Sequence, residues 1–594
     1  MMKKILVVFV FLLMFQVSGE AQIRYRIPKV LFITCGADQG RGTVSDGVVV
    51  ALQAFNRLGI FVRLEDRSAL LRPRLLEQYD ILIVPSIKSY HDKPQMNSLT
   101  YMSSVELRNI AAWVKNGGTL IADVNTGRNT LEGKDRFLKD GILNVNNWEL
   151  GRCFGVALQE KNTSPFVLKD TGAGIWKRNI MGKKDREIWR PVVVDYAPSV
   201  RILGYWYDDK PVYPAITFNS YGKGKALLLP TFYMLHPVGD GGLSTIKEIY
   251  DFYAFVIRNI AGDEIPEVHI SPWKDGHTSV FCLTFDDGGN MEEYNRVFDF
   301  INKNKIPTVF FMTSNVDKDI KNKLEKQELI SIQGHSYKHP DFRKLDYYAS
   351  ERQLLMNRMF WNRNFEGFRF PYVSNSFWGM FLLDRLGFVY ETSIAADNMD
   401  FIRGSVVPYN IPVFKDDFFT TLDLLEISPA SRSDWHFYKK VQNPAGYSVE
   451  AQKKDAALFK DYLIKYFDKV SSPVNGVMVY LGHPMFCGHS QYTFSPLQEF
   501  YDYIKDKNVW IASLNEVARR WNKLKNTETV ISGNKDHITI ECDAHGENID
   551  KFTLVFNQKP GKIVYTGKYA LKEAGGKYYL VFDLKDKAVF EIHF

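Results

Sequence analysis

Cysteine is scarce in this chain of 594 residues, which contains only five, at positions 35, 153, 282, 487 and 542. So odd and sparse a set excludes a disulfide framework as the basis of its stability. The formal net charge is only +7 and no dense basic run lies beyond the amino terminus, so nucleic acid is not an expected partner. Internal repeats and low-complexity tracts are also absent. With 45% hydrophobic residues we expect packed cores rather than long disordered stretches.

Long apolar runs are absent except at the amino terminus. There, two lysines in residues 1–4 precede the apolar run 5–15, which is the pattern of a secretory signal peptide. Small residues offer cleavage points after Gly19 or Ala21, so residues 1–21 are the expected signal. We therefore expect export to the periplasm or the extracellular space, with no stable membrane span after processing. An uncleaved membrane anchor is the alternative.

The length of the chain predicts three or four domains, because single cores rarely grow beyond about 250–300 residues. The alternation of strands and helices predicts an α/β protein. Residues 28–262 alternate strands such as 29–34 and 118–123 with helices such as 104–115, which predicts a doubly wound parallel sheet. After a linker at 266–273, residues 273–525 repeat strand and helix, which predicts an irregular (β/α) barrel.

The carboxyl-terminal region, residues 529–594, has a different pattern. Four short alternating runs, at 538–542, 552–556, 578–582 and 588–592, are separated by turns rich in Gly, Asn and Lys. This pattern predicts a small antiparallel β-sandwich. We expect it either to bind glycan or to cap the barrel.

Two adjacent carboxylates, Asp286 and Asp287, follow the apolar run 280–285 and precede Gly288. At the end of a strand such a pair can divide one reaction, with one carboxylate holding a metal and the other accepting a proton from water. An Asp-Gly pair alone is more often a turn signal, so residues farther along the chain must decide between the two interpretations.

Two histidines four positions apart, His335 and His339, follow this motif. Their spacing lets both imidazoles reach one ion if the segment turns helically. One carboxylate and two histidines form a zinc-type ligand set, and three protein ligands leave a position open for water. We therefore expect one divalent cation, with zinc preferred, although cobalt, iron and nickel also suit this set.

Two further segments place polar residues just past short β-prone runs. Arg369 follows the run beginning at 367, and His483 follows the run 477–481. Four segments of the chain thus place polar residues at the ends of predicted strands. Barrel enzymes carry their catalytic residues at the carboxyl ends of their strands, so we expect the four segments to meet at one rim of the barrel. Hydrolysis of an acetamide needs an acid that protonates the leaving amine, and histidine supplies one near neutral pH. His483 fits that need.

In these motifs, residues 273–520 resemble the NodB-homology polysaccharide deacetylases of carbohydrate esterase family 4. The resemblance depends on an ordered set of segments: 284–288, 335–339, 369–372 and 481–483. As a set these motifs are highly specific. The resemblance implies a metal-dependent hydrolase that acts on the amide bonds of acetylated carbohydrate.

The resemblance also assigns roles to individual residues. It implies that Asp286 is the general base, that His483 is the general acid and that Arg369 orients Asp286. The backbone amide of Tyr372 would help to bind the oxyanion. The implied metal ligands are Asp287, His335 and His339.

One part of the family pattern stays open in this sequence. The family usually pairs its general acid with an acidic residue that stands beside a tryptophan. Asp434-Trp435 matches that pair by residue type, and Asp397 is the second candidate. A neighbouring carboxylate would raise the pKa of His483 and keep it protonated. The identity of this carboxylate, Asp434 or Asp397, therefore determines which residue sets that pKa.

Residues 28–262 resemble the class I glutamine amidotransferase-like fold, with residues 221–230 as a late hairpin and strand. That family needs a cysteine on a tight turn after a strand, whereas here the strand ending at Asp123 is followed by Val124-Asn125-Thr126-Gly127. Glycines 36, 40 and 42 miss the dinucleotide-binding spacing and are more typical of a loop. We expect a structural, oligomerising or glycan-binding role for this domain.

The sequence thus predicts an exported deacetylase whose partner is an acetylated polysaccharide, with N-acetyl groups of an aminosugar polymer or peptidoglycan as the preferred substrate. Two alternatives stay open. One is an O-acetyl esterase acting on xylan, because an ester demands less of the leaving group. The other is a catalytically weak glycan-binding protein.

Overall fold

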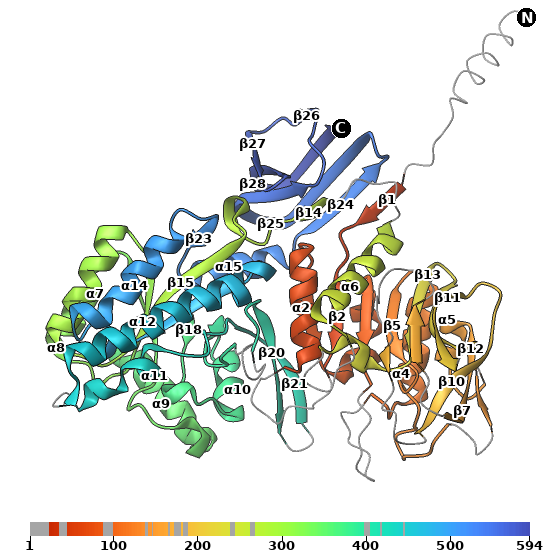
Figure 1. Cartoon of the computed structure of the whole chain (residues 1–594), viewed down its shortest axis with the longest axis horizontal. Coiled ribbons are helices and arrows are strands. Elements are labelled where there is room, and N and C mark those ends of the chain that lie inside the picture. Colours follow the sequence, from red (N-terminus) through yellow and green to blue (C-terminus); the bar gives the residue numbers. More distant parts are fainter. Residues whose placement is uncertain are drawn as a thin grey trace, which may run out of the picture. The chain divides into compact units, whose positions relative to one another are not determined.

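The structure is a computed structural model that describes residues 23–34, 44–86, 99–136, 141–144, 146–163, 167–170, 180–181, 188–208, 210–237, 244–261, 268–396, 404–415, 418–443 and 446–594. The expected signal peptide, glycines 36, 40 and 42, and Asp397 lie outside the described residues. The chain divides into two compact units (Figure 1). One comprises Pro28–Val256 and His277–Asn522, and the other combines Ile257–Gly276 and Lys523–Phe594 with the segment that ends at Ile27.

The larger unit begins with a nine-stranded sheet. Its strands, in spatial order, are β3 (Val62–Glu65), β2 (Val30–Ile33), β4 (Ile81–Val84), β5 (Thr119–Asp123), β13 (Gly224–Leu229), β12 (Lys210–Tyr221), β11 (Arg201–Asp208), β8 (Val167–Asp170) and β9 (Ile180–Met181). The first five strands are parallel, as the sequence predicted, but the last four pair antiparallel. The sheet is therefore mixed. Only two residues connect β12 to β13, which is too short for the crossover that parallel neighbours require.

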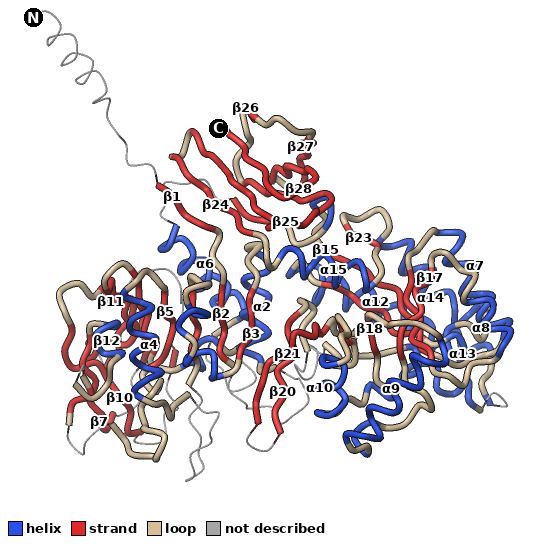
Figure 2. Tube along the Cα trace, turned by 180° about the vertical axis from the view of Figure 1, so that it is seen from behind, coloured by secondary structure: helices blue, strands red, loops and turns tan. Residues whose placement is uncertain are grey.

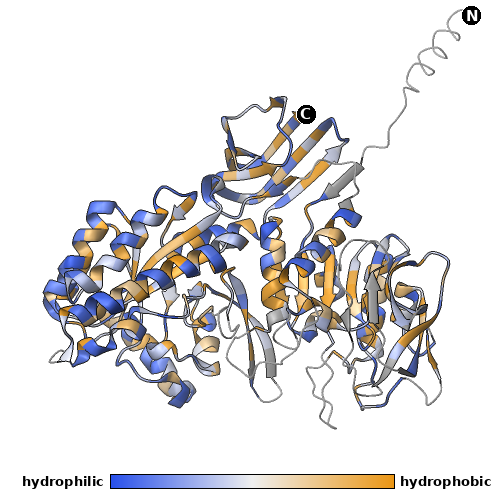
Figure 3. Ribbon diagram, viewed as in Figure 1, coloured by the Kyte–Doolittle hydropathy of each residue, from blue (hydrophilic) through white to orange (hydrophobic). Residues whose placement is uncertain are grey.

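Helices and buried strands give this sheet its core. Strands β2, β4 and β5 are buried along their whole length, as parallel strands covered on both faces are. The apolar colouring of these strands is visible in Figure 3. The accompanying helices are α2 (Asp46–Arg57), α4 (Ser104–Lys115) and α6 (Ile246–Ala261). Helix α4 begins with a capping box between Ser103 and Glu106. A separate three-stranded sheet contains β10 (Ile188–Tyr196), β7 (Val156–Thr163) and β6 (Ile142–Leu143).

The second sheet of the larger unit also has nine strands. Its path runs through β20 (Tyr409–Lys415), β21 (Phe418–Glu426), β19 (Tyr390–Glu391), β18 (Gly367–Phe368), β17 (Ile330–Gly334), β16 (Thr308–Met312), β15 (Ser279–Asp286) and β22 (Val477–Gly482), and β23 (Val509–Ile511) pairs with β15. All pairs are parallel except the hairpin of β20 and β21, which the sequence did not predict.

This second sheet curls into an irregular barrel (Figure 2). Beyond β21, Pro429 forms an isolated parallel bridge with Val479 of β22, and the Ala430 amide donates to the Val479 carbonyl at 3.0 Å. One bridge thus joins the two sides of the sheet, and the carboxyl ends of its parallel strands face one common rim. Helices alternate with the strands: α7 (Met291–Asn304), α8 (Lys318–Leu324), α9 (Tyr347–Trp361), α10 (Phe377–Arg385), α12 (Val449–Tyr466), α14 (Gln491–Ile504) and α15 (Leu514–Leu524).

The smaller unit is built on a seven-stranded antiparallel sheet. Its strands are β1 (Ile23–Arg26), β24 (Glu528–Gly533), β25 (His537–Phe556), β28 (Lys577–His593), β26 (Lys562–Val564), β14 (Val268–Ile270) and β27 (Tyr569–Ala574). The four short runs expected from the sequence are thus two long strands, β25 and β28. The expected linker contributes β14, and β1 comes from the amino-terminal end of the chain.

Bends in the long strands explain why the sequence pattern looked like separate short ones. The pairing of β25 with β28 shifts register between Asp543 and Asn548 and again between Ile549 and Phe552. Phe582 and Phe590, both on β28, have ring centroids 4.5 Å apart. The strand therefore bends enough to pack its two halves against one core. Among the helices that the structure describes, none has the length and apolar character needed to cross a membrane.

Candidate active site

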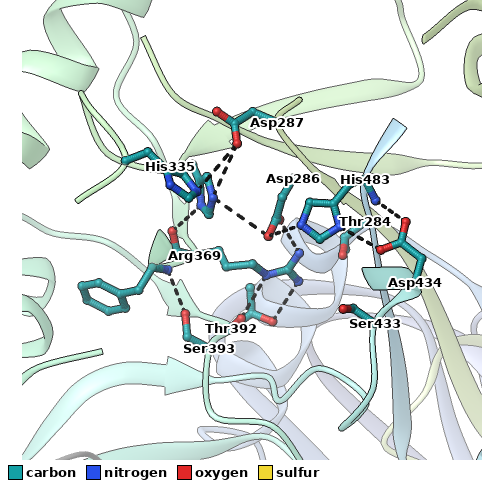
Figure 4. A network of polar contacts seen from close by, with 12 residues as sticks. Thr284, Asp286, Asp287, His335, Arg369, Thr392, Ser393, Ser433, Asp434 and His483 are labelled. Atoms are coloured by element: carbon teal, nitrogen blue, oxygen red, sulfur yellow. Dashed lines mark hydrogen bonds and ion pairs between the residues drawn. The ribbon is translucent and has the colours of Figure 1, made fainter. Parts of the chain in front are cut away.

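A cleft of about 780 Å³ opens at the rim of the barrel, where the predicted site residues meet (Figure 4). Its walls include Asp286, Asp287, His335, His339, Tyr372 and His483. Arg369 lies beneath this surface and is fully buried. The sequence-predicted residues thus converge from the ends of β15, β17, β18 and β22, because parallel strands bring their carboxyl ends to one edge.

The three predicted metal ligands lie together. His335 Nε2 is 3.8 Å and His339 Nε2 is 4.0 Å from Asp287 Oδ1, and one donor atom from each of the three residues lies within 4.8 Å of the others. Donors around a tetrahedral zinc are separated by roughly 3.4 Å when each is about 2.1 Å from the ion. Small side-chain rotations would therefore suffice to hold a cation, and two imidazoles with one carboxylate suit zinc.

The two histidines do not lie on a helix. The sequence analysis expected a helical turn, because a spacing of four residues brings two side chains to one face of a helix. The segment after β17 is a loop in which Ser336 and His339 have positive φ angles of 77° and 56°. The His339 amide donates to Ser336 Oγ at 3.0 Å, which holds this turn. The loop thus places both imidazoles at the rim of the barrel. The spacing of the two histidines does not reveal the positive φ angles that this placement requires.

Hydrogen bonds behind the ligands fix their orientation. His335 Nδ1 donates to the Arg369 carbonyl at 2.7 Å, so Nε2 carries the lone pair that faces Asp287. The Thr313 hydroxyl donates a hydrogen bond to Asp287 Oδ2. Partners of this kind hold the donor atoms of a metal site in place. The sequence analysis missed Thr313, although it stands just past the strand that neighbours β15.

Asp286 is held from below by a buried arginine. Arg369 donates to Asp286 Oδ1 at 2.7 Å and, through Nε, to the Thr392 carbonyl at 3.0 Å. The guanidinium also lies over the Phe311 ring, with 4.4 Å between its central carbon and the ring centroid. These contacts fix the plane of the guanidinium and leave Asp286 Oδ2 facing His335, whose Nε2 is 4.0 Å away.

The charges around Asp286 keep it ionised. Burial is the largest influence and favours the neutral acid. The positive charge and hydrogen bond of Arg369, together with His483, outweigh burial and hold the pKa of Asp286 below its ordinary value. Asp286 is therefore available as an acceptor of protons.

The acidic partner of His483 is Asp434. His483 Nδ1 donates to Asp434 Oδ1 at 2.8 Å, and the His483 amide donates to Asp434 Oδ2 at 2.7 Å. The carboxylate of Asp434 is fully buried at the start of α11 (Asp434–Tyr438). The contact pairs His483 with Asp434, one of the two candidates that the sequence left open, and Asp397 lies outside the described residues.

Asp434 changes the acidity of His483. Burial is the largest influence on this imidazole and favours its neutral form, but the charge and hydrogen bond of Asp434, with the charge of Asp286, outweigh it and raise the pKa of His483. Nε2 of His483 faces the cleft and lies 4.0 Å from Asp286 Oδ2. A carboxylate and a protonated imidazole therefore face the same space.

The loop after β18 brings Tyr372 to the cleft in an uncommon backbone conformation. Tyr372 and Val373 have positive φ angles of 60° and 52°. The Tyr372 ring is 68% exposed and packs edge-on against the His339 ring, with 4.5 Å between centroids. Consecutive non-glycine residues with positive φ are strained, and such strain is concentrated at functional sites. Across the cleft, Trp435 also lines the wall and is 41% exposed.

Residues 274–377 match the family model of the polysaccharide deacetylases. We call residues 273–525 the barrel domain. The matched segment contains Asp286, Asp287, both histidine ligands, Arg369 and Tyr372, whereas Asp434 and His483 lie beyond it.

Solved structures also resemble the chain over this region. One is a protein from Mycobacterium smegmatis described as a polysaccharide deacetylase, with 18% identity, a TM-score of 0.35, and coverage of 42% of this chain and 92% of that one. Another is a family 4 carbohydrate esterase from Streptomyces lividans in complex with acetate, with 13% identity, a TM-score of 0.25, and coverage of 39% and 92%. A third is the Xyl-CE4 domain of a multidomain xylanase from the hindgut metagenome of Trinervitermes trinervoides, with 13% identity, a TM-score of 0.26, and coverage of 41% and 91%. Among curated proteins, none matches this chain.

The end of β5 in the amino-terminal domain forms a polar cluster of a different kind. Asp123 accepts hydrogen bonds from the Ser86 hydroxyl at 2.5 Å and from the amides of Asn125 and Phe232 at 2.9 Å each. Burial raises the pKa of Asp123 to about 6 despite these bonds. The Asp123 side chain thus connects the neighbouring turns through hydrogen bonds. The resemblance of residues 28–262 to amidotransferases stays a prediction.

Proposed function

We propose that this protein is an exported, metal-dependent hydrolase that removes N-acetyl groups from an aminosugar-containing polysaccharide. One observation carries the proposal. The donor atoms of Asp287, His335 and His339 lie within 4.8 Å of one another, beside a second carboxylate, Asp286, that Arg369 holds at 2.7 Å. The match of residues 274–377 to the polysaccharide deacetylase family supports acetylated carbohydrate as the substrate.

The residues of the site fit a divalent cation. His335 uses Nδ1 for its hydrogen bond to a carbonyl, so Nε2 is the donor left for a metal, and Thr313 orients the Asp287 carboxylate. A divalent cation bound here would polarise the acetyl carbonyl and lower the pKa of a bound water. The chain supplies the remaining chemistry.

Asp286 is the proposed general base. Its carboxylate stays ionised because Arg369 and His483 lower its pKa, and its Oδ2 lies 4.0 Å from Nε2 of both His335 and His483. It can therefore accept the proton of the attacking water while Arg369 keeps its orientation fixed. Placement of this kind contributes about 10²–10⁴-fold to the rate.

His483 is the proposed general acid. Asp434 raises its pKa, so the imidazole carries a proton that Nε2 can deliver to the leaving amine. An amine leaves poorly unless it is protonated, and an acid of this kind is therefore more important for an amide than for an ester. The backbone amide of Tyr372 is the proposed donor to the oxyanion, a contact worth about 3–4 kcal/mol in other hydrolases.

The position of Asp434 weakens the case for a catalytically weak glycan-binding protein. That alternative depended partly on the lack of an identified acidic partner for His483. The O-acetyl esterase alternative needs a direct comparison of substrates. Export is proposed from the amino-terminal sequence, and both expected cleavage points precede β1.

The test is an acetate-release assay with chitin oligomers, N-acetylated peptidoglycan and acetylated xylan, each with and without chelator. We expect release from an aminosugar substrate, loss of that release with chelator, and recovery on addition of zinc. Release only from acetylated xylan would favour the esterase. Saturable glycan binding without acetate release from any substrate would overturn the proposal.

Asp286→Asn separates catalysis from metal binding in the same assay. The amide keeps the shape of the side chain but cannot accept the proton, so turnover should fall at least about 10²-fold while zinc content is unchanged. Asp299→Asn, at an exposed position of α7, is the matched control and should retain full activity.

A further inference from the structure

Two histidines and a glutamate meet on the sheet of the smaller unit, far along the chain from the deacetylase motifs. His537 begins β25 and pairs directly with His593 at the end of β28. Glu591 precedes His593 by two positions, so both side chains point to the same face of the sheet. Strand register and alternation therefore bring three metal-binding side chains to one face.

The side chains are close enough to share a ligand. The rings of His537 and His593 are stacked with 4.4 Å between centroids and 28° between planes. One donor atom from each of His537, Glu591 and His593 lies within 4.8 Å of the others. Both histidines are partly buried and Glu591 is exposed.

One donor atom in this cluster lacks a protein partner. His537 Nε2 is buried, and the part of the chain that the structure describes offers it no hydrogen bond. A buried polar atom without a partner costs free energy, about 1–3 kcal/mol, unless something else satisfies it. A cation held jointly with His593 and Glu591 would do so.

We propose that His537, Glu591 and His593 bind a divalent transition-metal cation, with zinc as the best match. Two imidazoles and one carboxylate are the same donor set as in the deacetylase cleft, and they suit zinc, nickel or copper rather than magnesium or calcium. Donors around a tetrahedral zinc are roughly 3.4 Å apart, which the exposed Glu591 can reach by rotation.

The cation at this site cross-links the first residue of β25 to the last residue of β28. The end of the chain is already anchored nearby, because the Phe594 amide donates to the Asp536 carbonyl at 3.0 Å. A cation that binds only the folded sheet stabilises it in proportion to its concentration relative to Kd. The proposed role of the site is therefore structural: the cation stabilises the pairing of β25 with β28. This role does not depend on the proposed catalytic function.

Lys562 gives the proposal a second, opposite test. It pairs with His593 from the other neighbouring strand, β26, so its side chain projects from the same face. Its positive charge opposes a bound cation. Lys562→Gln should therefore tighten zinc binding severalfold, whereas Glu591→Gln should weaken it at least tenfold.

The experiment measures zinc per chain by elemental analysis after the full-length protein is loaded with zinc and desalted. We expect two zinc ions in the natural protein, one in His593→Gln, one in His335→Gln and none in the double variant. His545→Gln, an exposed histidine of β25 outside the cluster, is the matched control and should keep two. Acetate release should be unchanged in His593→Gln.

The proposal fails if His593→Gln and Glu591→Gln hold as much zinc as the natural protein. Glu591 is exposed, so its substitution does not compromise folding and keeps this outcome decisive. A heat-unfolding midpoint that zinc raises equally in the natural protein and in Glu591→Gln would also overturn it. Failure of the catalytic proposal would appear separately, as unchanged zinc content in His335→Gln.

Discussion

Two titratable residues in the cleft, Asp286 and His483, have environments that move their pKa values apart. Arg369 lowers the pKa of Asp286, and Asp434 raises the pKa of His483. One is therefore a carboxylate and the other an imidazolium over a shared range of pH. Such separation assigns the base and the acid of a hydrolytic site.

Removal of the charge on Asp434 should shift the pH dependence of turnover. The raised pKa keeps His483 protonated to higher pH, and its acid function is lost as pH rises through that value. In Asp434→Asn the pKa of His483 falls, so the alkaline limb of kcat against pH should move at least about one unit lower. The measurement is kcat across pH 5 to pH 10.

Asp455→Asn is the matched control, since this buried aspartate pairs with Lys440 rather than with His483. It should leave the alkaline limb in place. An alkaline limb that stays unchanged in Asp434→Asn would show that His483 is not the acid that limits turnover at high pH.

Thr313 should matter for metal affinity rather than for the chemical step. Its hydroxyl orients Asp287, and loss of such a partner typically weakens metal binding about 10–100-fold. We expect Thr313→Val to need more zinc for half-maximal activity and to approach normal kcat at saturating zinc. Thr308→Val, at the opposite end of β16, removes a hydroxyl that bonds the Ile306 carbonyl and should leave zinc affinity unchanged. Equal zinc requirements in both variants would refute the role of Thr313.

Among the elements, strands β19 and β21 carry an unusual pair of acids. Glu391 of β19 and Glu426 of β21 are paired in register, and both are fully buried. Burial raises the pKa of both carboxyls, and the charge of Glu391 raises that of Glu426 further. The raised pKa values keep these carboxyls protonated to higher pH than exposed glutamates, and the Ile394 amide donates to Glu426 at 3.1 Å.

This pair should make the stability of the barrel domain fall as pH rises. A carboxyl whose pKa is raised in the folded state stabilises it fully below the unfolded pKa, near 4.3, and loses that contribution as pH rises through the folded pKa. Glu426→Gln removes this titration, so the variant should be more stable than the natural protein at alkaline pH, by about 1 kcal/mol or more. Urea unfolding at pH 5 and pH 9 measures the effect.

Glu325→Gln is the control, because this glutamate forms an ion pair at the partly exposed end of α8. Its effect should be small and nearly equal at the two pH values. A Glu426→Gln variant that loses stability equally at pH 5 and pH 9 would contradict a raised pKa at Glu426.

At the scale of the whole molecule, the two ends of the chain build one sheet. Strand β1 pairs with β24, and the Ile27 amide donates to the Thr529 carbonyl at 2.8 Å. Strand β14, between the two α/β domains in sequence, adds to the same sheet. The smaller unit therefore cannot form completely from residues 529–594 alone.

Ile27→Pro should destabilise the smaller unit without affecting catalysis. Proline removes the amide that bonds Thr529, and the substitution should cost about 2–3 kcal/mol. Hydrogen exchange should show faster exchange of β24 amides, while acetate release stays unchanged. Ile27→Val keeps the amide and most of the buried side chain, so its exchange should be close to natural. Unchanged exchange in the proline variant would show that β1 contributes little.

Much of the site could be predicted because ligand chemistry and strand ends are local properties of a sequence. Asp286, Asp287, His335 and His483 each lie at or just past the end of a strand, and parallel strands necessarily bring their carboxyl ends together. Thr313 escaped prediction because an isolated threonine after a strand has no distinguishing pattern. The bends of β25 and β28 escaped because a bulge interrupts the alternation that identifies a strand.

The sequence by itself determined the chemistry of this protein: an ordered set of carboxylates and imidazoles at strand ends, and the parallel α/β frame that collects them. Only the tertiary structure decided which acid pairs with His483, how a loop with positive φ angles brings His339 to the ligands, and which distant strands complete the last sheet. The physical reason is the separation along the chain over which each kind of interaction acts. Apolar periodicity and residue chemistry act over a few positions, whereas these contacts join residues separated by tens to hundreds of positions, and only packing selects among them.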